Sequence, residues 1–149
     1  MDRKDREKYV FGSILLLANK LQNWGDGVVE DISMKQWLLV MLISKMGTEN
    51  PTLKEVADFS GTSRQNVKKI LEQLEKKGYV KIVKSGIDAR ALNVSLTKKT
   101  YDYFEAHAEK GDKAVNTLFS EIMDDELITT SRTLEKLLVL FGNPPLEEL

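Results

Sequence analysis

The feature that most constrains the fold is a pair of short helical segments separated by a tight turn. Thr52 and Glu55 have the three-residue spacing of a capping box, which predicts the start of a helix. Thr62 and Gln65 repeat that spacing ten residues later. The turn at 60–63 contains a glycine and is too short for another element. Two capped helices joined in this way predict a helix-turn-helix.

The hydrophobic pattern then changes from the period of a helix to that of a strand. After Gly78, the runs 79–84 and 91–96 are rich in β-branched and alternating residues, and turn-forming residues lie between them at 85–89. A hairpin directly after the second helix predicts a winged helix. In that arrangement the helix enters the major groove of DNA, while the hairpin tip can reach the backbone or the minor groove.

The rest of the chain is predicted to be helical, so the fold class is mainly α with a small β component (α+β). Apolar residues at helical spacing predict helices from about residue 5 to 24, from Ser33 to about Met46, from Thr97 to about Met123, and from 124 to 141. The last of these begins with three acidic residues, which suit the positive end of a helix.

Charge is segregated along the chain. Residues 62–99 carry ten Lys or Arg and three Asp or Glu, a net charge of +7, although the whole chain has a net charge of −1. The remainder is therefore at −8. A cationic module on an acidic body favours a polyanionic partner such as double-stranded DNA. The alternative is that the helices carry lysines only for solubility.

Composition excludes several classes of function. The chain has no cysteine and one histidine, His107, so thiol chemistry is absent, and metal or Ser-His-Asp sites are hard to build. We expect His107 to be an ordinary residue on a helix face. No phosphate loop or nucleophile elbow is present, so we predict no enzyme, no metal and no cofactor. The longest uncharged apolar run, 10–19, is too short to cross a bilayer, and residues 1–7 alternate acid and base; we predict a cytoplasmic protein without membrane association.

Several segments together resemble the MarR-type regulators. They are Ile32-Ser33-Met34-Lys35-Gln36-Trp37, Leu53-Lys54-Glu55-Val56-Ala57, Gly61-Thr62-Ser63-Arg64-Gln65-Asn66-Val67, Leu74-Glu75-Lys76-Lys77-Gly78-Tyr79-Val80, Asp88-Ala89-Arg90 and Val94-Ser95-Leu96-Thr97. The match lies in their order and spacing over nearly the whole chain. One departure is Ala89, which stands where the family often has a second arginine.

The resemblance implies a homodimeric winged-helix transcription factor whose first and last helices intertwine. It divides the chain into dimerisation helices at 1–31 and 120–149, a winged helix-turn-helix lobe at 32–99, and a long connecting helix at 97–123. The apolar faces of the terminal helices independently favour a partner subunit, because one small monomer could not readily cover them. A two-fold dimer would read a pseudo-palindrome with half-sites about 10 bp apart.

Candidate DNA contacts follow from this placement. Base-reading candidates at the start of the second helix are Ser63, Arg64, Gln65 and Asn66. Phosphate-binding candidates are Lys68 and Lys69, with Lys84 and Arg90 in the wing for the backbone or minor groove. Asp88 is expected to orient Arg90 by a charge-assisted hydrogen bond. The alternative is that Gln65 is only a capping partner and that both helix lysines are simply solvated.

The resemblance also implies a possible small-molecule effector, aromatic or anionic, in a cleft beside the dimerisation helices. Candidate lining residues are Tyr9, Trp24, Trp37 and Tyr101, although at least half of these aromatics are expected to be ordinary core residues. The predicted function is a sequence-specific regulator, with repression favoured and release by a ligand possible. The alternative is a winged-helix protein-interaction module without specific DNA binding.

Overall fold

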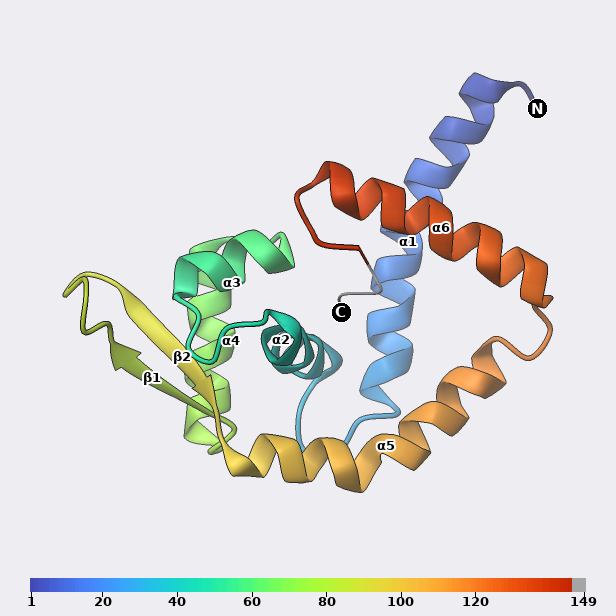
Figure 1. The fold of residues 1–149 in the computed structure, drawn as a ribbon. Coiled ribbons are helices and arrows are strands. Elements are labelled where there is room, and N and C mark those ends of the chain that lie inside the picture. The colour runs from blue at the N-terminus through green and yellow to red at the C-terminus, as the bar shows by residue number, and fades with distance from the viewer. Residues whose placement is uncertain (146–149) are drawn as a thin grey trace.

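The computed structural model describes residues 1–145, and over these residues the fold is mainly helical with one small sheet (Figure 1). The elements in chain order are α1 (Arg3–Asp26), α2 (Met34–Lys45), α3 (Leu53–Ser60), α4 (Arg64–Lys76), β1 (Val80–Lys84), β2 (Leu92–Leu96), α5 (Lys98–Leu118) and α6 (Asp124–Leu140). The mainly α, winged helix-turn-helix fold predicted from the sequence is confirmed.

Two of the predicted helix ends are wrong. α1 continues past Trp24 to Asp26, because Gly25 is buried in the helix and lets Met34 pack against its Cα. α5 ends at Leu118 rather than near Met123. Apolar residues continue at helical spacing through the turn at 119–123, so the sequence pattern could not reveal that end.

The winged helix-turn-helix lobe is built around one hydrophobic core. α2, α3, α4 and both strands contribute to it, and its completely buried side chains include Val40, Val67, Leu71, Leu74 and Val94. β1 and β2 pair antiparallel in a register from Val80↔Leu96 to Lys84↔Leu92. A bridge between Thr52 and Asn93 joins the hairpin to the residue that caps α3. The hairpin is therefore attached to the helix-turn-helix along β2, and the loop beyond the Lys84↔Leu92 pair projects away from the lobe (Figure 1).

The terminal helices carry apolar side chains that this chain does not cover. α6 has no buried residue, and Gly25 is the single buried residue of α1. Large exposed apolar side chains on these helices and the turn before α6 include Tyr9, Phe11, Leu15, Leu16, Leu17, Ile122, Ile128, Leu134, Leu138 and Phe141. Within residues 1–145 no helix is long and apolar enough to span a membrane.

Candidate nucleic-acid interface

The start of α4 is fixed by Ser63, one residue later than the sequence pattern predicts. The Ser63 hydroxyl accepts a hydrogen bond from the backbone N–H of Asn66 at 3.1 Å. Thr62, the predicted cap, instead accepts from the Asn66 side-chain amide at 2.9 Å. The predicted Thr62–Gln65 capping box is therefore wrong, since adjacent hydroxyl residues can serve equally well at this position. Gln65 does not cap the helix.

Burial of one stripe of α4 turns the candidate residues toward solvent. Val67, Leu71 and Leu74 recur at the spacing of one helix face and are completely buried. The cap and the rest of the surface of the first two turns present Ser63, Arg64, Gln65, Asn66, Lys68 and Lys69, all of them exposed. Their six side chains lie over the first two turns of the helix. This is the geometry of a helix that can enter a groove by its N-terminal end.

The two helix lysines differ in their partners. Lys68 Nζ lies 3.9 Å from Glu72 Oε1, and both side chains are more than half exposed. Such an exposed pair contributes about 0–1 kcal/mol, so a phosphate can displace the glutamate readily. Lys69 forms no ion pair with any residue in the described part of the chain. Both ammonium groups are thus accessible to an anion.

The wing presents Lys84 and Arg90 near its tip, and both are exposed. Asp88 Oδ1 accepts a hydrogen bond from the backbone N–H of Arg90 at 2.9 Å. Among residues 1–145 there is no ion pair between the Asp88 carboxylate and the Arg90 guanidinium. Asp88 therefore stabilises the turn through the backbone, and the expected charge-assisted bond to the Arg90 side chain does not form.

Two cations of the +7 segment are used inside the protein. Lys77 donates to the backbone carbonyl of Asp31. Lys99 donates to the carbonyl of Lys77 at 2.6 Å, and its ammonium lies 4.5 Å from the centroid of the Tyr79 ring. These contacts join the end of α4 and the start of α5 to the loop after α1. The cations left for a polyanion are concentrated at the start of α4 and in the wing.

A polar cluster that the sequence analysis does not predict, here called the junction, lies between the α1–α2 loop and α5. Glu30 Oε1 accepts from Lys110 Nζ at 2.6 Å, and Glu30 Oε2 lies 3.5 Å from His107 Nε2. The hydrogen bond and charge of Lys110 hold the pKa of Glu30 below its ordinary value. The Tyr103 hydroxyl donates to the Glu30 carbonyl at 2.8 Å and accepts from the Glu30 N–H at 3.3 Å.

The junction continues to the start of the wing. The Tyr79 hydroxyl donates to Asp31 Oδ2, which lowers the pKa of Asp31. Burial, and then this hydrogen bond, raises the pKa of Tyr79. The Tyr79 ring meets Tyr103 edge-on at 5.6 Å, and Tyr103 stacks on His107 at 4.1 Å. One loop is therefore tied both to α5 and to the residue that precedes β1.

His107 belongs to this junction, where its Nδ1 lies 2.9 Å from the Tyr103 carbonyl. Within the described residues there is no group of three or more His, Cys, Asp or Glu side chains that could hold a metal ion. Junction partners such as Glu30 and Lys110 lie 80 residues apart in the sequence. A periodicity analysis, which works within single elements, offers no signal for such a contact.

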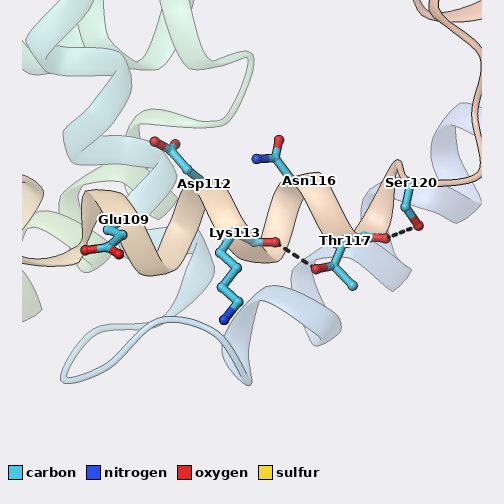
Figure 2. A pocket seen from close by; sticks show the side chains of 6 residues that line it. All are labelled: Glu109, Asp112, Lys113, Asn116, Thr117 and Ser120. Carbon is cyan, nitrogen blue, oxygen red and sulfur yellow. Dashed lines mark hydrogen bonds between the residues drawn. The ribbon is translucent and has the colours of Figure 1, made fainter.

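Two open hollows lie along α5. The larger, about 690 Å³, is lined by polar side chains of α5 and the following turn, including Glu109, Lys113 and Asn116 (Figure 2). The second, about 540 Å³, is lined by Trp24, Val28, Lys110, Lys113, Ala114, Thr117 and Leu118. It therefore combines an indole with two ammonium groups.

The four predicted effector-binding aromatics do not share one site in the described chain. Trp24 lines the second hollow. Tyr9 is exposed on α1, and Trp37 packs against the core of the lobe. Tyr101 is exposed on α5, where its ring meets Phe104 edge-on at 6.4 Å. Residue type alone predicts a lining role for each of the four, because it does not show which way a side chain faces.

The lobe, with its exposed cationic helix and hairpin, defines a winged helix-turn-helix protein. Residues 30–91 match the family model of the MarR family. Over 111 residues the chain is 31% identical to the uncharacterized HTH-type transcriptional regulator YfiV of Bacillus subtilis, covering 74% of this chain and 68% of YfiV. The chain belongs to the MarR family of transcriptional regulators, as its sequence resemblance indicated, and it is not an enzyme.

Two further similarities extend over most of the chain. The transcriptional repressor MprA of Escherichia coli K12 is 24% identical over 140 residues, which cover 89% of this chain and 80% of MprA. A crystal structure of a mutant MarR from E. coli complexed with operator DNA superimposes with a TM-score of 0.75 at 20% identity, covering 93% of this chain and 99% of that chain. At that identity the superposition establishes the shared fold.

Proposed function

We propose that this regulator binds double-stranded DNA sequence-specifically, with the start of α4 in the major groove. The observation that carries the proposal is the exposed, capped first turn, in which the side chains of Arg64 and Gln65 have no hydrogen bond or ion pair with a described residue. Arg64 suits the two acceptors of a guanine, and Gln65 suits adenine. Ser63 and Asn66 are further base-edge candidates. The similar fold of a mutant MarR that was crystallised with operator DNA supports DNA as the ligand.

Phosphate contacts accompany base reading in this proposal. Lys68 and Lys69 approach the backbone beside the recognition turn, while Lys84 and Arg90 reach the backbone or the minor groove from the wing. Neutralising phosphates releases counterions, so the affinity falls as salt concentration rises. Arg90→Ala is expected to weaken operator binding several-fold at matched salt. Lys54→Ala, on the exposed side of α3 and outside the proposed contact set, is the matched control.

The active form in this proposal is a homodimer. Segments 1–31 and 120–149 form the dimerisation region, and 32–99 is the DNA-binding lobe; residues 146–149 lie outside the described residues. The connecting helix is α5, which ends at Leu118. The uncovered apolar faces of α1 and α6 support it, because burial against a second copy removes that area from water. Two recognition helices then address half-sites about one helical turn, or 10 bp, apart on a pseudo-palindrome.

Sedimentation equilibrium tests the dimer directly. Leu16 is 56% exposed on α1, and Leu16→Glu is expected to shift the protein toward monomer. Leu38→Glu makes the same chemical change on α2 of the lobe, where the leucine is 38% exposed, and is expected to leave the dimer intact. Equal dissociation by the two variants, or a monomeric wild-type protein, contradicts the proposed interface.

Repression in the cytoplasm, relieved by a small aromatic or anionic effector, completes the proposal. Similarity to the transcriptional repressor MprA supports repression rather than activation. The hollow lined by Trp24, Lys110 and Lys113 supports an aromatic acid, since the indole offers a stacking face and Lys113, which has no ion pair with a described residue, offers charge; the Lys110 ammonium is already paired with Glu30. Thermal shift with aromatic carboxylates tests this, with aromatic amines as charge-reversed controls. Lys113→Met is expected to remove the carboxylate-dependent shift, and a shift unchanged in that variant contradicts this site.

Selection of bound duplexes from a random pool at near-physiological salt tests the function as a whole. Wild-type protein is expected to enrich an inverted repeat, and Arg64→Ala is expected to lose it. If no motif emerges and all binding disappears by about 0.2 M salt, the contact is only electrostatic. That result contradicts sequence-specific regulation and favours a winged-helix protein-interaction module.

A further inference from the structure

The tip of the wing carries one apolar side chain that nothing in the described chain covers. Ile87 lies in the loop between β1 and β2, and its exposed fraction is 102%. The charged neighbours Lys84 and Arg90 are also exposed. The wing projects on the side of the lobe opposite to α6 and the N-terminus (Figure 1), so the apolar terminal helices of this chain cannot cover it.

The backbone around Ile87 is held in place by side-chain hydrogen bonds. The Ser85 hydroxyl accepts from the N–H groups of Ile87 at 3.2 Å and of Asp88 at 3.3 Å. Asp88 Oδ1 accepts from the N–H of Arg90, and the loop is closed by a bond from Ser85 N to Ala91 O at 2.9 Å. Isoleucine also has a restricted χ1 angle. The tip therefore presents a stiff aliphatic side chain at a low entropic penalty for binding.

We propose that Ile87 inserts into the minor groove of the bound duplex and makes an apolar contact there. This inference rests on the proposed DNA-binding function and adds a contact of a different chemistry. The walls of the minor groove are the C–H faces of the deoxyribose rings, and aliphatic side chains are used in this groove as wedges. The flanking cations Lys84 and Arg90 match the two phosphate rows that border it.

Duplex DNA fits this surface better than a protein does. The exposed neighbours of Ile87 in the loop are Gly86, Asp88, Ala89 and Arg90, and Val83 on β1 is 53% exposed. Together these side chains offer a smaller apolar patch than protein partners bury. A narrow groove between two rows of phosphates needs one slender apolar group with positive charge on either side. The wing tip has that composition.

The inference predicts an unusual salt response. Removing a phosphate-binding lysine lowers both the affinity and the slope of log affinity against log salt. Ile87 carries no charge, so Ile87→Ser is expected to lower operator affinity about five- to tenfold, the scale of partly burying one aliphatic side chain, with the salt slope unchanged. Ile87→Leu keeps an aliphatic group and is expected to retain most of the affinity. Thermal unfolding should match the wild type in both variants, because the side chain has no contact to lose on folding.

Tethered cleavage locates the side chain, because the chain contains no cysteine and Ile87→Cys creates a unique attachment point. An iron–EDTA group attached there is expected to cut both strands with the cuts offset to the 3′ side, as a radical source in the minor groove does. A 5′ offset, or no cleavage by a conjugate that binds the operator, contradicts the inference.

Wild-type and Arg64→Ala proteins are measured in parallel on the same selected operator. If wild type selects an operator and Ile87→Ser binds it equally well, the wing inference is wrong while the proposed function stands. If wild type selects no operator, the proposed function fails, and the wing inference fails with it.

Discussion

Tyr103→Phe tests whether the junction holds the DNA-binding lobe onto α5. The substitution removes one hydroxyl and keeps the ring, which is 7% exposed and packs against Tyr79 and His107. The lost bonds are the 2.8 Å donation to the Glu30 carbonyl and the 3.3 Å acceptance from the Glu30 N–H. A typical hydrogen bond contributes about 0.5–1.5 kcal/mol. Because one of the two is long and Glu30 is accessible to water, we expect a loss of about 1–1.5 kcal/mol.

Thermal unfolding at fixed protein concentration measures this effect, and for a chain of this size each kcal/mol lowers the Tm by about 2–4 °C. Tyr101→Phe is the matched control, since Tyr101 is 55% exposed and its hydroxyl has no hydrogen-bond partner among the described residues. We expect Tyr103→Phe to be clearly less stable than this control. Equal stability of the two variants would refute the assignment of the junction as a structural tie.

Two further predictions follow from the cap and from the junction carboxylates. Ser63→Ala should destabilise the protein by about 1 kcal/mol in chemical denaturation, and by more than Thr62→Ala; the reverse order would restore Thr62 as the cap. Hydrogen bonds at the junction lower the pKa values of Glu30 and Asp31 in the folded protein below their ordinary 4.5 and 3.8. The two carboxylates therefore stabilise the fold at pH values above 4.5 and 3.8. This stabilisation is lost as the pH falls through the lowered pKa values. Glu30→Gln should make the acid side of a stability-against-pH curve shallower, and an unchanged curve would contradict this.

Local signals in the sequence were sufficient to predict the DNA-binding lobe. Capping spacings and the buried stripe Val67, Leu71 and Leu74 report short-range geometry, and the change to strand period after Gly78 reports the hairpin. Two of the errors arise from local ambiguity in the sequence. Thr62 and Ser63 both carry a hydroxyl that can cap α4, and the sequence does not show which of them does so. The apolar residues after Leu118 keep helical spacing although the helix has ended.

The junction could not be predicted because it depends on contacts between distant segments. Nothing near Glu30 in the sequence indicates Lys110 or Tyr103 as its partner. The same reason applies to Lys77 and Lys99, which count toward the cationic segment in a sequence sum but are bound to backbone carbonyls in the fold. Charge along a chain therefore overstates the charge that a surface offers.

Binding of wild-type protein and Arg64→Ala to two duplexes at one salt concentration tests the central claim most directly. One duplex carries the selected inverted repeat, and the other has the same composition in scrambled order. The structure predicts that wild type prefers the repeat by about 10³-fold or more, and that Arg64→Ala loses about tenfold or more of this preference while keeping most of its affinity for the scrambled duplex. Equal binding of wild type to both duplexes would contradict sequence-specific recognition by α4.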